Sequence, residues 1–169
     1  LTAIPAANIT GTLPAISGAS LTGIAGRKNM IINGAMNVAQ RGTSATGQLY
    51  LTVDRFKAHQ NGVDEDITQA QHVLTSSDTG PWAAGFRYSY HQTNGNQTSG
   101  AEAGDRVTFQ YRMESRDIAF SGWDYTSSSS YITLSFWCKS SVAQNFYGTL
   151  DSKDGTRQGY PFETGSLTA

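Results

Sequence analysis

The sequence predicts an all-β protein: a jelly-roll-like β-sandwich preceded by an extended, repeat-built fibre stem that trimerises. Three observations predict this fold class. Residues 1–24 are two copies of one short unit; the rest of the chain alternates apolar and polar residues in short segments separated by turns; and no segment has a convincing helical period. We therefore divide the 169 residues into a stem, 1–26, and a sandwich, 27–169.

The stem consists of adjoining copies of a 12-residue unit, 1–12 and 13–24, with the shared pattern L-x-A-I-x-x-A-[NS]-[IL]-T-G-x. Each copy has only three large apolar side chains, too few to offset the ordering entropy of its own backbone. Because Pro, Thr and Ile favour an extended chain and Gly allows close backbone approach, we expect these side chains to meet symmetry mates around a threefold axis. The alternative is an irregular Ala/Gly/Thr linker. The expected oligomer-interface residues are Leu1, Ile4, Ile9, Leu13, Ile16, Leu21 and Ile24.

Composition argues against several function classes. The formal net charge is −1 and the chain has no basic run, which argues against a nucleic-acid binder. Cys138 is the only cysteine, so an intrachain disulfide and a thiolate metal cluster are excluded. The chain has no long uninterrupted apolar run, so we do not expect it to insert into a membrane. The histidines show no metal-ligand spacing, and we expect neither a metal nor a cofactor.

Alternation and β-branched or aromatic content predict the strands of the sandwich. The turn pairs Asn33-Gly34, Asn61-Gly62 and Asp154-Gly155 separate some of them. We expect a solvated acidic loop at 64–66, a long exposed loop at 93–104 and a single helical turn at 116–120. The predicted strands are 36–38, 50–58, 67–74, 85–91, 105–113, 131–141, 146–150 and 159–162.

Side-chain alternation also predicts which residues share a face. In strand 50–58, Tyr50, Thr52 and Asp54 are expected on one face, with Leu51, Val53 and Arg55 on the other. Segment 131–141 has the clearest alternation, with one core-facing row and with Trp137 pointing the other way beside Ser135 and Lys139. That core row is Ile132, Leu134, Phe136 and Cys138.

The segment Arg27-Lys-Asn-Met-Ile-Ile-Asn-Gly-Ala-Met-Asn-Val-Ala-Gln-Arg-Gly-Thr-Ser44 resembles the opening of a carbohydrate-binding-like β-sandwich domain of bacteriophage tail fibres and related virion proteins. The family opens with N-x-x-x-N-G followed by W or A and Q-R-G-T-S. Thr52-Val-Asp-Arg-Phe56 and the strand 131–141 also match, and the repeat is similar to fibre shaft segments, so the resemblance covers most of the chain. The family's sandwich usually continues further, which implies a last strand or two beyond residue 169.

The sequence does not assemble a catalytic site. A glycosidase needs two carboxylates at a defined separation, and nothing in the sequence pairs any two of the candidates. No G-x-S-x-G motif is present for a serine nucleophile. We therefore expect a protein that is not an enzyme. The carboxylates considered are Asp54, Asp105, Glu114, Asp117 and Asp124.

Carbohydrate binding is the chemistry that the aromatic residues favour. Flat aromatic rings hold the apolar face of a sugar, and planar polar groups hold its hydroxyls. Trp82 and Trp123 are expected in loops, where a rigid framework can present them to a ligand. The alternative for each aromatic residue is capping of the core or packing at a subunit interface. The candidate sugar contacts are Trp82, Trp123, Asp124, Tyr125 and Trp137.

Together these features predict a trimeric tail fibre protein of a phage virion, used for host attachment or for connecting the fibre to the tail. Its expected partners are two further copies of itself, other virion proteins and a host surface glycan, with no nucleic acid. Trimerisation would multiply weak sugar contacts into tight attachment. Two alternatives stay open: a head fibre or capsid decoration protein, and a carbohydrate-binding accessory domain of a larger enzyme.

Overall fold

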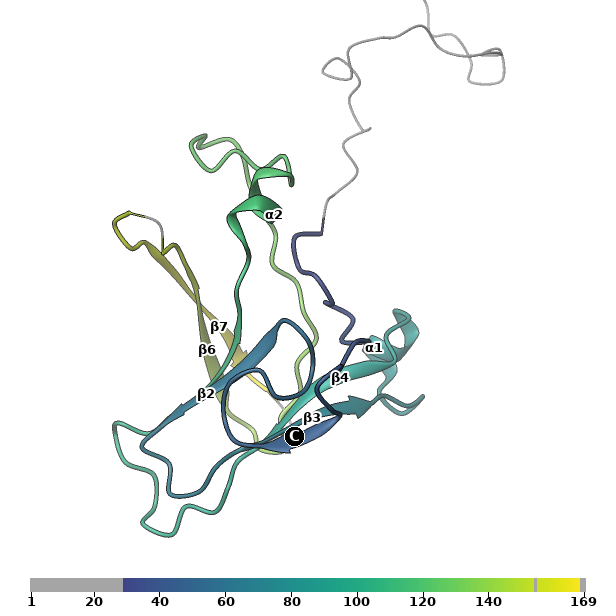
Figure 1. Cartoon of the computed structure of the whole chain (residues 1–169), viewed down its shortest axis with the longest axis vertical. Helices are drawn as coiled ribbons and strands as arrows, with labels where there is room; N and C mark the ends of the chain where they lie inside the picture. The colour runs from purple at the N-terminus through teal and green to yellow at the C-terminus, as the bar shows by residue number, and fades with distance from the viewer. Residues whose placement is uncertain (1–28, 154, 168–169) are drawn as a thin grey trace, which may run out of the picture. The chain divides into compact units, whose positions relative to one another are not determined.

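The structure is a computed structural model that describes residues 29–153 and 155–167. The predicted stem and its expected interface residues, Leu1 to Ile24, lie outside the described residues. The described chain forms two compact units. The sheet unit comprises 29–72 and 88–132, and the hairpin unit comprises 73–87 and the chain from 133 on. Strands outnumber helices in both units, so the expectation of a β-rich fold is confirmed (Figure 1).

The sheet unit contains two small antiparallel sheets. The first has the order β1-β3-β4, built from β1 (Ser44–Thr46), β3 (Thr68–Val73) and β4 (Tyr88–Thr93). The second pairs β2 (Phe56–Asn61) with β5 (Arg106–Tyr111), in register from Phe56 opposite Tyr111 to Asn61 opposite Arg106. A short helix, α2 (Ser115–Ala119), follows β5 where the sequence predicts one helical turn.

An aromatic cluster around the buried Phe56 lies between the two sheets of the sheet unit. The Phe56 ring stacks on Phe109 with 5.1 Å between centroids and also contacts Tyr111, as the alternation along β5 predicts. Tyr90 packs on Phe109 at 4.6 Å and donates its hydroxyl to Gln69 Oε1 at 3.0 Å. Gln69 is fully buried and donates its Nε2 to the Gly47 carbonyl at 2.6 Å. Burial raises the pKa of Tyr90. The ring contact between Tyr90 and Phe109 joins the two sheets, while the hydrogen bonds of Tyr90 and Gln69 satisfy polar groups within the first sheet.

The predicted strand 50–58 is wrong in its first half. β2 begins only at Phe56, because the chain makes a tight turn closed by a hydrogen bond from Phe56 N–H to the Val53 carbonyl. Arg55 occupies the third position of this turn with φ +76°, a left-handed conformation that is usually left to glycine. The turn abolishes the predicted alternation, so Asp54 and Arg55 do not lie on opposite faces of a strand.

The acidic loop after β2 is exposed, as expected, but it is also paired with the long loop before β5. The Asp64 carboxylate accepts the Ser99 backbone N–H at 2.7 Å and its hydroxyl at 2.9 Å, and the Thr98 hydroxyl at 3.3 Å. Glu65 accepts the Asn96 backbone N–H at 2.9 Å. The pKa of Asp64 is lowered, chiefly by the Ser99 N–H. These contacts give a Gly- and Ser-rich loop a defined path.

The hairpin unit contains α1 (Thr79–Ala83) and the antiparallel pair β6 (Asn145–Asp151) and β7 (Gly159–Ser166), which Figure 1 shows side by side. The predicted hairpin is therefore confirmed. Gly148 lies opposite Phe162, whose ring covers the space that a side chain at 148 would occupy. The sequence does not predict α1, because five residues are too few to show a helical period.

The clearest strand prediction, 131–141, is not borne out. A strand needs a neighbour for its backbone hydrogen bonds, and within the described residues no strand pairs with this segment. Its predicted core row is also largely exposed: Leu134 is 38% accessible, Phe136 53%, and Cys138 is exposed. Alternation alone therefore mispredicts both the pairing and the burial of this segment.

Candidate functional site

Two of the expected sugar-binding aromatics, Trp82 and Trp137, lie at α1 of the hairpin unit, Trp82 within the helix and Trp137 against its Gly80. The turn before α1 is held by Asp78, whose carboxylate accepts the Thr75 backbone N–H at 3.0 Å. This N–H is the main reason that the pKa of Asp78 is lowered. Trp82 therefore lies in a helix and not in the predicted loop.

Trp137 packs directly on the backbone of Gly80 in α1. A Cβ added at Gly80 would lie 2.5 Å from one carbon of the Trp137 ring and 2.9 Å from another. Two residues further on, the Lys139 ammonium lies 3.6 Å from the Asp78 carboxylate. Trp137 and Lys139 thus share one side of an extended segment, as alternation predicts, and that side lies along α1.

Trp82 is stacked with an arginine from the same unit. The Arg87 guanidinium carbon lies 3.8 Å from the centre of the Trp82 ring, within the range of a cation–π contact. Arg87 also donates to the carbonyls of Trp82, at 3.1 Å, and Phe86, at 2.7 Å, which holds the guanidinium in place. One face of the Trp82 ring is therefore occupied by a fixed cation.

We name Trp82, Arg87, Trp137 and Lys139 the α1 platform. The Trp137 ring is 62% exposed and provides the open apolar surface of the platform. Lys139, two residues along the same segment, provides N–H donors, Asp78 provides an acceptor, and Arg87 provides donors at Trp82. An open ring with donors and acceptors at its margin is the arrangement that holds a sugar ring by its face and its hydroxyls.

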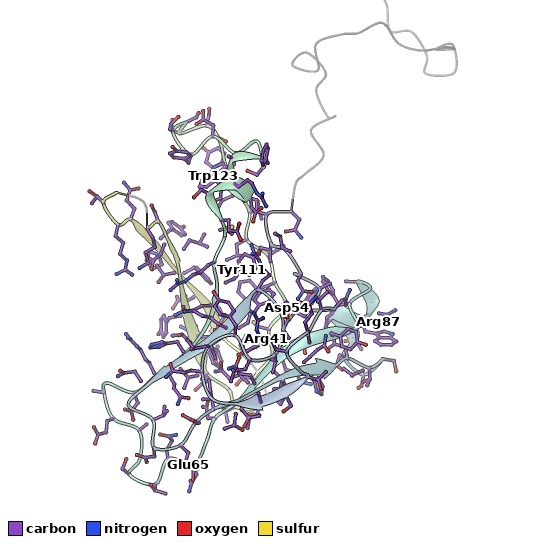
Figure 2. All side chains as sticks on the ribbon, in the orientation of Figure 1. Arg41, Asp54, Glu65, Arg87, Tyr111 and Trp123 are labelled. Carbon is purple, nitrogen blue, oxygen red and sulfur yellow. The ribbon has the colours of Figure 1, made fainter. Side chains whose placement is uncertain are left out.

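The remaining candidates, Trp123, Asp124 and Tyr125, lie together in the sheet unit. Trp123 is half-buried and donates its ring N–H to the Ser130 carbonyl at 3.3 Å (Figure 2). Asp124 accepts the hydroxyl of Thr126 at 2.6 Å and its backbone N–H at 3.0 Å, which together lower the pKa of Asp124. Both side chains thus stabilise their own loop, while Tyr125 is 74% exposed.

A groove of about 380 Å³ in the sheet unit contains charged residues that sequence reasoning did not group. We name it the Arg55 groove. The sequence presents two of its members, Asp54 and Glu114, only as unpaired carboxylates and does not indicate their arginine neighbours. The one available signal is the charged pair 54–55 within an otherwise strand-like segment. Its main lining residues are Arg41, Tyr50, Asp54, Arg55, Arg112 and Glu114.

Within 29–153 and 155–167, no group of three or more His, Cys, Asp or Glu side chains is placed to hold a metal ion. His72 and His91 do form an edge-to-face pair across β3 and β4, with ring centres 5.5 Å apart. No helix of the described chain is long and apolar enough to span a membrane. No protein-family model matches this sequence, and neither a curated protein nor a solved structure is significantly similar to it.

Proposed function

We propose that the chain is a structural component of a phage virion, a trimeric tail fibre protein that attaches the particle to a glycan on the host surface. The single observation that carries the binding function is the α1 platform, where Trp137 is presented on Gly80, with Lys139 on the same segment and the Trp82–Arg87 pair on and after the helix. An exposed tryptophan held against a glycine has a fixed ring orientation, which reduces the entropy lost when a ligand stacks on it.

The virion assignment and the trimer rest on the sequence: the resemblance of 27–44 to the opening of the fibre domain, and the repeat at 1–24. We propose that the β-rich units belong to a jelly-roll-like sandwich. The short sheets of the sheet unit and the β6–β7 hairpin are the strand pairs from which such a sandwich is made. In a trimer, three weak platforms would act on one surface, so millimolar single-site affinity would suffice.

We further propose that the chain binds sugar without hydrolysing it. Glycoside hydrolysis requires a carboxylic acid whose pKa is raised, so that it can protonate the leaving oxygen. In the Arg55 groove the pKa of Glu114 is instead lowered, chiefly by its hydrogen bond from Arg55. Asp64, Asp78 and Asp124 also have lowered pKa values. The lowered pKa values of these groups go with hydrogen bonds that they accept from their own neighbours, and no carboxylic acid among them is suited to donate a proton.

The test of binding is a panel of immobilised bacterial surface polysaccharides, followed by titration of the best ligand. Trp137→Ala should weaken binding at least tenfold, about 1.4 kcal/mol. The matched control is Tyr160→Ala, which removes another exposed aromatic ring, 71% accessible, from β7 of the same unit. Equal affinity of the two variants, or the absence of any polysaccharide ligand, would refute this function.

The test of assembly is the solution mass, measured by light scattering for 1–169 and for 27–169. We expect a trimer that becomes a monomer when the repeat is removed. A trimer in both cases would move the assembly contact into the β-rich part of the chain. A monomer for the full chain would overturn the proposal that the repeat assembles the protein.

A further inference from the structure

The groove beside Arg55 has the composition of a second ligand site, separate from the α1 platform. We propose that it binds an acidic sugar, with the carboxylate or phosphate of that sugar held by Arg41 and Arg112 and its hydroxyls held by Asp54 and Glu114. All of these residues line one groove within the sheet unit. A volume of about 380 Å³ fits one sugar residue.

Arg55 fixes the centre of the groove. Its guanidinium donates to Glu114 at 2.6 Å and to Asp117 at 3.4 Å, so both of its terminal nitrogens are engaged by carboxylates at the start of α2. Its backbone is held at φ +76° by the Val53–Phe56 turn. An arginine in this conformation costs free energy that glycine would not, which is common at sites where a side chain must be placed accurately. Arg55 is therefore a positioning residue that orients Glu114.

Arg41 and Arg112 have donors that the protein leaves unused. Arg41 is 58% exposed, and its nearest carboxylate oxygen, on Asp54, is 3.7 Å away, beyond hydrogen-bond distance (Figure 2). The side chain of Arg112 is exposed and makes no ion pair or hydrogen bond to another described residue. A guanidinium is suited to a carboxylate or phosphate because it offers paired, parallel N–H donors.

The acids of the groove distinguish an acidic sugar from a simple anion. A site that binds only a phosphate or carboxylate group would not place two carboxylates next to its arginine donors, because these negative charges would repel the anion. Asp54 is already oriented, since it accepts the Gln40 backbone N–H at 3.2 Å. Asp54 and Glu114 can each accept sugar hydroxyls, and the Tyr50 ring adds an aromatic surface. A ligand that carries both a negative group and hydroxyls satisfies the whole set.

The experiment is calorimetric titration of the full chain, at low ionic strength, with three probes. Trigalacturonate supplies carboxylates, mannose 6-phosphate supplies a phosphate, and maltotriose is the neutral control. We expect at least one acidic probe to bind at least tenfold more tightly than maltotriose. The acidic probe that binds more tightly shows whether the groove prefers a carboxylate or a phosphate. Equal binding of all three, or no binding of either acidic probe, would overturn the proposal.

Variants locate the binding. Arg112→Gln and Arg41→Gln should each lower the affinity for the acidic probe at least tenfold. Raising the salt concentration should lower this affinity further. Arg106→Gln is the matched control, because it removes the same charge from an exposed position at the start of β5, outside the groove. Circular dichroism checks that each variant is folded. Equal losses in all three variants, or no loss in Arg41→Gln and Arg112→Gln, would overturn the assignment.

This site does not depend on the proposed function of the α1 platform. Trp137→Ala should leave the affinity for the acidic probe within twofold, because Trp137 is not among the residues that line the groove. If Trp137→Ala abolishes binding of the acidic probe and Arg112→Gln does not, the probe binds at the α1 platform. That result would overturn the proposal that the Arg55 groove is its site.

Discussion

The substitution Gly80→Ala tests whether the position of Trp137 on α1 matters for binding. The new Cβ would lie 2.5 Å and 2.9 Å from two carbons of the Trp137 ring. Ordinary carbon–carbon contacts are about 3.5 to 4.0 Å, so the ring must move by about 1 Å or swing away. Because Trp137 is 62% exposed, it can move without disrupting a core.

The same change favours the helix itself. Ala is more favourable than Gly inside a helix by about 0.5 to 1 kcal/mol, so the free energy of unfolding should stay equal or rise by up to about 1 kcal/mol. Sugar affinity should fall about three- to tenfold, because a displaced ring loses a contact of about 0.7 to 1.4 kcal/mol. The prediction is thus a loss of affinity without a loss of stability.

Two measurements on each variant decide the outcome. Urea unfolding followed by circular dichroism gives stability, and fluorescence titration with the best polysaccharide of the panel gives affinity. The control is Gly104→Ala, where the added Cβ meets nothing within 4 Å. Unchanged affinity in Gly80→Ala would refute the platform geometry. A parallel fall in stability and affinity would show that the contact supports the fold and not the site.

Three further predictions concern stability. Tyr90→Phe leaves the buried Gln69 oxygen without its donor and should cost about 1 to 3 kcal/mol in urea unfolding, whereas Tyr88→Phe, whose hydroxyl bonds no described residue, should cost little. Burial raises the pKa of Tyr90 in the folded state, so the stability that Tyr90 contributes is complete below the ordinary tyrosine pKa of about 10 and is lost as the pH rises above it. The free energy of unfolding of Tyr90→Phe should therefore fall less than that of the unsubstituted protein at alkaline pH. The same pH dependence in both proteins would contradict this. Gly148→Ala places a methyl group in the ring of Phe162 and should destabilise the hairpin by about 1 to 3 kcal/mol, which an unchanged melting temperature would disprove.

Segments whose structure depends on local pattern could be predicted from the sequence. β5 alternates over Val107, Phe109 and Tyr111, and the two rings do share the face that meets Phe56. The β6–β7 hairpin was also predicted, from two short strand-like segments around a turn pair. In both cases the pattern repeats within the segment, and the pairing partner lies within the described chain.

Features that depend on single residues or on distant contacts could not be predicted. A left-handed residue that is not glycine leaves no sequence signal, so the pattern predicts a continuous strand through the turn at Arg55. The ion pair between Arg55 and Glu114 joins residues 59 positions apart, and no motif links them. Segment 131–141 has the pattern of a strand but lacks a paired neighbour among the described residues, and sequence pattern cannot report whether a neighbour exists.

Of the candidate site residues, sequence reasoning identified the aromatic types but not their surroundings. It did not predict that Trp137 rests on Gly80, because residues 80 and 137 are related only through the fold. Sequence reasoning also does not predict that the Asp124 carboxylate accepts hydrogen bonds from Thr126, although an Asp two residues before a Thr is a common turn pattern. The polar neighbours of an aromatic ring therefore required the structure.

The pairing of the acidic loop with the loop before β5 has a consequence for the durability of the protein. A protease must draw a stretch of chain out into its active site, and a long polar loop is normally where it first succeeds. Here Asp64 and Glu65 hold the backbone N–H groups of Ser99 and Asn96, so that stretch must first break charge-assisted hydrogen bonds. A protein exposed to environmental proteases would thus keep this loop intact, and acidification below the lowered pKa of Asp64 would weaken the hold on it.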